Sequence, residues 1–126
     1  MPVMEATVSI HSWLGWAVVV VCGLSGLVAL GYHFGRRRPD VAFKAMVSAC
    51  VVSAILQVGL GLVLFAQDME PGSIHMFYGF VILLTLTFVY IYRVQFERRP
   101  ALYWGLALLF MMGLGLRGIS SFGASF

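Results

Sequence analysis

Charged residues are scarce in this chain. Lysine, arginine, aspartate and glutamate make up 10% of its 126 residues, whereas soluble domains carry about 25%. Only two cysteines are present, so no disulfide framework is expected. The chain is 61% hydrophobic, with a mean hydropathy of +0.96. This composition excludes a soluble globular domain, a disordered chain and a disulfide-rich secreted scaffold, and it predicts an integral membrane protein in contact with the lipid bilayer.

Four apolar stretches are long enough to cross a membrane. A hydrocarbon core of about 30 Å needs about 20 apolar residues in a helix. Interruptions by charged residues, proline or glycine leave four such segments, at roughly residues 11–34, 43–66, 74–92 and 101–119. The links between them are short, which makes consecutive helices antiparallel neighbours. We therefore expect one all-α domain over residues 1–126, folded as an up-down-up-down four-helix bundle.

The basic residues are unevenly distributed. Seven of the eight lie in or beside the first and third links, and the exception is Arg117. Because cytoplasmic links carry an excess of Lys and Arg, both termini are expected on the outer, periplasmic side of a membrane such as a prokaryotic plasma membrane. The net charge of +3 is explained by this orientation, so no nucleic-acid partner is expected. The absence of an acidic residue within any span disfavours transport.

A short pattern occurs twice in the chain. Residues 9–16 and 73–80 share the sequence S-I-H-x-aromatic-x-G-aromatic, 64 residues apart. The sequence Gly-Leu-Gly-Leu also occurs twice, at 59–62 and 113–116. We interpret the chain as two related helical hairpins.

The repeat places two histidines at matching positions. His11 and His75 are each expected to open a helix, and the first and third spans run in the same direction. Both imidazoles should therefore lie at similar depth near the outer face, pointing at each other between diagonal helices. Gly15 and Gly79 follow four residues later, on the same helix face and about 6 Å deeper. They would leave a strip of bare backbone beneath each ring.

Histidines inside membranes are costly and usually functional, and neutral imidazole is a strong ligand for haem iron. The sequence thus predicts one bis-histidine haem b near the outer face, with His11 and His75 as metal ligands. Other residues expected around the cofactor are Gly15, Gly79, Gly59, Gly113, Arg117 and Gln57.

These residues also have purely structural interpretations. An isolated interfacial histidine is more often solvated than ligating, and the glycines equally fit packing seams between helices. Arg117 would either pair with a haem propionate or extend to the lipid headgroups. Gln57 would either donate to a cofactor or bond a neighbouring helix. His33 lies 22 residues from His11, about 33 Å along a helix, and therefore cannot serve the same site.

The stretch Leu-Gln-Val-Gly-Leu-Gly at 56–61, followed by Pro71 and His75, resembles the L-Q-x-x-x-G … P … H pattern of one half of heme A synthase. That family is built from two four-helix bundles, each with a histidine pair on its first and third helices near the outer face. The resemblance covers nearly the whole chain as a half-length unit. It implies that His11 and His75 form such a pair. The layout is also similar to that of four-helix membrane b-type cytochromes.

The chain departs from the heme A synthase pattern beside its first histidine. The family has a glutamate three residues before that histidine and an arginine just after it, where this chain has Val8 and Ser12. The resemblance therefore implies a bundle that holds haem, and it does not carry over the oxidation of haem.

Three functions remain open at this point. The first is a small haem b protein that relays electrons near the outer face as a subunit of a larger respiratory or photosynthetic complex, with no catalytic activity of its own and no soluble substrate. The second is a structural or assembly subunit without a cofactor. The third is a subunit that binds chlorophyll-type pigments, in which each histidine holds a separate pigment.

Overall fold

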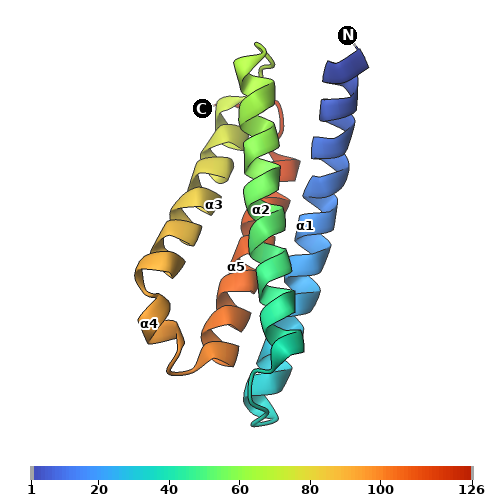
Figure 1. The fold of residues 1–126 in the computed structure, drawn as a ribbon. Coiled ribbons are helices and arrows are strands. Elements are labelled where there is room, and N and C mark those ends of the chain that lie inside the picture. Colours follow the sequence, from blue (N-terminus) through green and yellow to red (C-terminus); the bar gives the residue numbers. More distant parts are fainter. Residues whose placement is uncertain (1, 126) are drawn as a thin grey trace.

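The computed structural model describes residues 2–125, and this part of the chain is helical without strands. Figure 1 shows its elements in chain order. They are α1 (Pro2–Phe34), α2 (Val41–Ala66), α3 (Ser73–Ile91), α4 (Arg93–Phe96) and α5 (Pro100–Ser120). α1, α2, α3 and α5 are each long and apolar enough to cross a membrane. The expected all-helical fold is thereby confirmed, with four helices that are long and apolar enough to span a membrane.

The first helix is longer than expected. It begins at Pro2, nine residues before His11, so the expectation that His11 opens its helix is wrong. Proline is favourable in the first helical turn, and no further proline or glycine occurs before Gly15, so nothing interrupts the helix where the apolar stretch ends. With 33 residues, α1 is about 50 Å long and exceeds the thickness of a hydrocarbon core. The single-turn α4 also lies where only a link was expected.

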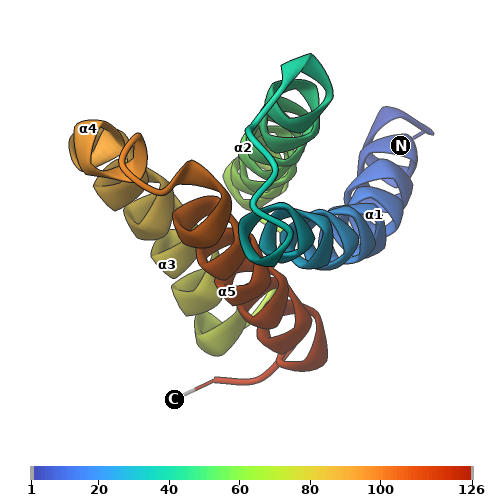
Figure 2. The same ribbon diagram turned by 90° about the horizontal axis from the view of Figure 1, so that it is seen from below.

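The helices pack around α5. α5 makes its most extensive contacts with α1 and then with α3, while α1 also packs on α2, and α2 touches α3 least. Both termini and the α2–α3 link lie at one end of the molecule, and the α1–α2 link and α4 lie at the other (Figure 1). Seen along the helices, α1 and α3 lie on opposite sides (Figure 2).

The core is formed mainly by α1, α2 and α5. Its most completely buried side chains are Leu108, Met111, Cys22 and Cys50, and both cysteines are free thiols. Outside this core, large apolar side chains are exposed along every long helix, which is consistent with contact with a lipid bilayer.

Two glycines bring α1 and α5 close together. A Cβ atom at Gly26 would lie 3.1 Å from the carbonyl oxygen of Gly105, and one at Gly105 would lie 3.2 Å from that of Gly26. The same added atoms would meet Leu109 and Leu30 at 2.8 Å. Small residues of this kind let membrane helices approach closely, so the backbones of α1 and α5 come close together at this pair.

Asp40 begins α2. Its Oδ1 accepts a hydrogen bond from the backbone N–H of Phe43 at 2.9 Å, and its Oδ2 accepts one from Arg37 at 2.9 Å. The backbone hydrogen bond from Phe43 is the main reason why the pKa of Asp40 lies below its usual value, and Tyr32 and Arg37 contribute in the same direction. Asp40 therefore acts as the helix cap of α2 in its charged form.

Candidate cofactor site

The structure brings the two repeat histidines together. His11 on α1 and His75 on α3 have ring centres 6.3 Å apart, with the ring planes at 78° to each other. Both side chains are partly buried at the end of the molecule that carries the termini. The pair thus joins the two diagonal helices.

His75 is fixed by α5. Its Nδ1 lies 2.6 Å from the backbone carbonyl oxygen of Gly118, and the ring of Phe122 packs edge-on against it with centres 5.4 Å apart. Because a carbonyl oxygen only accepts, Nδ1 carries the proton and Nε2 keeps its lone pair. This is the arrangement typical of metal-binding histidines, whose second nitrogen donates to a carbonyl or carboxylate.

His11 is held from α2. Gln57 Nε2 donates to the backbone carbonyl oxygen of His11 at 2.8 Å. The imidazole lies against Gly61, where an added Cβ would be only 3.1 Å from Cε1 of the ring. Among the described residues, Nδ1 of His11 and Oε1 of Gln57 are buried without a hydrogen-bond partner. Such atoms each cost about 1–3 kcal/mol, so His11 and Gln57 are the least satisfied polar groups of the site.

The four glycines predicted to line the cofactor divide into two groups. A Cβ at Gly15 would lie 2.9 Å from Gln57 Nε2, so this glycine makes room for the Gln57 side chain and leaves no bare strip. At Gly59, Gly79 and Gly113, an added Cβ would meet nothing within 4 Å among the described residues. Only these three leave open space beside the backbone.

Arg117 and His33 occupy opposite ends of the fold. Arg117 is exposed, and its Nε donates to the hydroxyl of Tyr78 at 3.4 Å, with the guanidinium 5.8 Å from the centre of that ring. Tyr78 thus holds Arg117 near α3, the helix that carries His75. His33 lies at the far end of α1 beside Phe34, as its spacing from His11 predicts.

Three contacts of the histidine pair were missed by sequence analysis: the Gly118 carbonyl, the Phe122 ring and the close approach of Gly61. Gly61 belongs to the repeated Gly-Leu-Gly-Leu sequence, so a signal for it existed. The Gly118 contact uses only a backbone atom, which no residue type reveals.

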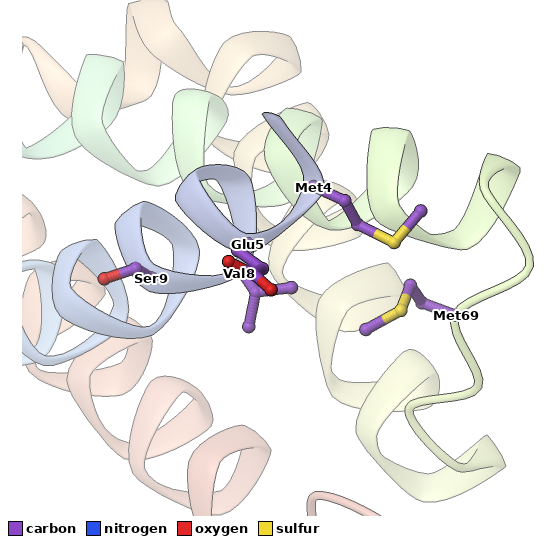
Figure 3. Close-up of a pocket in the computed structure, with 5 residues that line it drawn as sticks. All are labelled: Met4, Glu5, Val8, Ser9 and Met69. Carbon is purple, nitrogen blue, oxygen red and sulfur yellow. The ribbon is translucent and has the colours of Figure 1, made fainter. Parts of the chain in front are cut away.

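A shallow hollow of about 440 Å³ opens near the histidine site. Its lining residues are Met4, Glu5, Val8 and Ser9 of α1 and Met69 of the α2–α3 link, and the side chains of Met4 and Met69 lie across from each other (Figure 3). Neither histidine lines it, and Glu5 is its one acidic lining residue. The hollow is therefore a separate surface feature of this end.

No group of three or more histidine, cysteine, aspartate or glutamate residues in the described part of the chain is placed to hold a metal ion. In comparisons with known proteins, no family model, curated protein or solved structure matches this chain.

Proposed function

We propose that this protein holds one haem b between His11 and His75 and relays electrons near the outer membrane face, as a subunit of a larger respiratory or photosynthetic complex. Haem iron supplies reversible one-electron exchange when bound. The observation that carries the proposal is the pair of imidazoles 6.3 Å apart, one of which has its Nδ1 engaged by the Gly118 carbonyl.

The distance between the rings supports a shared metal. An imidazole nitrogen lies about 1.1 Å from its ring centre, and metal–nitrogen bonds are about 2.0–2.1 Å, so two imidazoles on opposite sides of one metal have centres about 6.3 Å apart. The observed separation is 6.3 Å. The open backbone at Gly59, Gly79 and Gly113 agrees with a planar group beside these helices.

The same distance disfavours two separate pigments between the histidines. Two stacked macrocycles, each ligated by its own histidine, would set the ring centres about 10 Å apart, since stacked planes are about 3.5 Å apart. With 6.3 Å between centres, one plane fits between the rings.

The proposal includes the topology and orientation of the bundle. We place the four spans up-down-up-down as two related hairpins, with the arginine-rich links in the cytoplasm and both termini outside. Arg117 would then be the cation available to a haem propionate at the outer face. The bundle is proposed as a half-length relative of heme A synthase that holds haem without oxidising it, because Val8 stands where that family has a glutamate.

Partner subunits are proposed on physical grounds. The links between the spans are short, so the protein offers little surface outside the membrane on which a soluble substrate could dock. Exposed apolar side chains along the long helices offer surface for both lipid and neighbouring membrane subunits. Electrons would therefore enter and leave through a partner protein.

An absorption spectrum of the detergent-purified protein tests the proposal. We expect a Soret band, with sharp α and β bands after reduction by dithionite. His11→Ala and His75→Ala should each reduce the haem content at least ten-fold, whereas His33→Ala, which removes a histidine from the opposite end, should leave it unchanged.

The other functions predict different spectra. A folded wild-type protein without any visible absorption would overturn the cofactor proposal and favour a structural subunit. Absorption in the red or near infrared would favour a chlorophyll-type pigment. Equal haem content in the His33→Ala and His75→Ala variants would also contradict the assignment of the ligands.

A further inference from the structure

A second site lies at the end of the molecule opposite the histidine pair. The α1–α2 link meets the residues that join α4 to α5, and a pocket of about 260 Å³ opens between them. Five arginines line this pocket: Arg36, Arg37, Arg38, Arg98 and Arg99. Figure 2 looks at this end of the molecule, with the two links that contribute the arginines in front.

Most of this positive charge is unpaired within the protein. Arg37 forms an ion pair with Asp40 at 2.9 Å, and no other ion pair occurs in residues 2–125. Glu97 is next to Arg98 in sequence and forms no ion pair with it. Four arginines therefore line one pocket without an acidic partner from the described chain, and this concentration of positive charge attracts anions.

The start of α5 adds to the attraction for an anion. Pro100 is in the first turn of α5 and also lines the pocket, and no side chain caps this helix end. The unpaired backbone N–H groups of a first helical turn carry partial positive charge and bind anions. The partial positive charge of this helix end therefore adds to that of the arginines.

Orientation in the membrane does not by itself explain why these arginines line one pocket. The positive-inside rule needs only an excess of basic residues on one side. Here residues 36–38 and 98–99, from links far apart in sequence, line one pocket. The pocket lies at the ends of the membrane-spanning helices, where lipid phosphates lie, and guanidinium groups bind phosphate through paired hydrogen bonds.

We propose that the pocket formed by Arg36, Arg37, Arg38, Arg98 and Arg99 binds the phosphate group of an anionic phospholipid. This site is independent of the histidine pair and of any haem. The bound phosphate would contact both arginine-rich links and so hold the α1–α2 link close to the residues that join α4 to α5.

The test uses the full-length protein, purified in a neutral detergent and depleted of lipid. Its melting temperature is measured with added phosphatidylglycerol, phosphatidylcholine or inorganic phosphate, and lipid affinity is measured by titration. We expect phosphatidylglycerol to stabilise the protein and to bind at least ten-fold more tightly than phosphatidylcholine. Arg36→Gln/Arg38→Gln and Arg98→Gln/Arg99→Gln should each reduce that affinity about ten-fold or more.

A charge-matched control separates the pocket from general attraction to anionic lipid. Lys44→Gln/Arg93→Gln removes two positive charges from the same end, at residues that do not line the pocket. This variant should keep its affinity within about two-fold of the wild type. An equal loss in the control and pocket variants would overturn the proposal, as would equal binding of the two lipids.

Inorganic phosphate distinguishes the source of the phosphate group. If the pocket takes a lipid, millimolar phosphate should compete weakly and stabilise less than phosphatidylglycerol. If phosphate alone gives the full stabilisation and the lipid adds nothing, the lipid assignment is wrong. The absorption spectrum is recorded on each variant, and an unchanged haem content in the pocket variants is the expected result.

Discussion

The Nδ1 atom of His75 on α3 lies 2.6 Å from the backbone carbonyl oxygen of Gly118 on α5. This contact spans 43 residues of sequence and fixes which nitrogen of the imidazole carries the proton. It also directs the remaining lone pair, on Nε2, away from α5. The histidine pair is therefore positioned by the neighbouring helix as well as by its own helices.

The contact predicts the tautomer of His75. In the haem-free protein at neutral pH, ¹⁵N NMR of histidine-labelled samples should show His75 protonated at Nδ1, because the Gly118 carbonyl can only accept. The signal is assigned by its loss in His75→Gln, and His33→Gln is the matched variant from the other end. A His75 protonated at Nε2 alone would contradict the hydrogen bond.

The close approach of Gly61 to His11 predicts that an alanine at Gly61 changes the absorption spectrum, whereas an alanine at Gly31 does not. Gly61→Ala would place a Cβ 3.1 Å from the imidazole, so the ring must shift by a few tenths of an ångström. We expect reduced haem content and an altered Soret band, with a smaller loss than in His11→Ala. Gly31→Ala, whose added Cβ meets nothing within 4 Å, should leave the spectrum unchanged. Identical spectra for both variants would argue against the placement of His11.

The α1–α5 contact predicts losses of stability at two glycines. Gly26→Ala and Gly105→Ala insert a methyl group between closely packed backbones and should destabilise the protein by about 1–3 kcal/mol each. Gly31→Ala has open space and should be neutral or stabilising by up to about 1 kcal/mol through helix propensity. Unfolding in mixed micelles of increasing SDS content measures these differences. Similar values for Gly26→Ala and Gly31→Ala would show that the helices are not this close.

The cap of α2 predicts a pH dependence. The pKa of Asp40 is lowered in the folded protein, first of all by the hydrogen bond from the Phe43 backbone. Its stabilising contribution is therefore complete above the ordinary pKa of an aspartate and is lost as the pH falls through the lowered value. Asp40→Ala should lower the melting temperature by a few degrees at pH 7 and much less at low pH.

Two further variants isolate the role of Asp40. Asp40→Asn should keep most of the cap, because asparagine caps helices about as well as aspartate, while it removes the pH dependence and the ion pair with Arg37. Glu97→Ala removes an acidic residue at the same end and should change little. A pH profile of Asp40→Ala that parallels the wild type throughout would contradict this assignment.

The two buried thiols predict resistance to alkylation. Cys22 and Cys50 are both completely inaccessible in the core, and Cys50 Sγ donates to the backbone carbonyl oxygen of Val21 at 3.8 Å. A membrane-permeant maleimide should leave both unmodified until SDS unfolds the protein. An exposed cysteine introduced by Ser120→Cys should react fully under native conditions. Rapid labelling of the wild-type protein would show that this part of the core is open.

The number of helices long enough to span a membrane followed from the sequence because it depends on local properties. The length of each apolar stretch and the breaks between them sufficed to predict the four spans. The extension of α1 to Pro2 was missed because the prediction used the length of the apolar stretch, which shows only how much of the chain lies inside the bilayer. The helix itself continues beyond that stretch until a residue interrupts it. The uneven distribution of arginines was also visible, since the order of residues in the sequence shows which links carry them.

For the site, the sequence by itself determined that His11 and His75 are a pair, because they occur in matching local sequences. Tertiary structure decided how they are held. Gln57 bonds the His11 carbonyl across 46 residues, the space beside Gly15 goes to Gln57, and the Gly118 carbonyl engages His75. Every residue has a backbone carbonyl, and a helix can turn any side toward its neighbour. Which carbonyl meets which side chain is therefore decided only when the helices pack together. The same reason applies to the arginines, whose numbers were plain in the sequence and whose shared pocket was not.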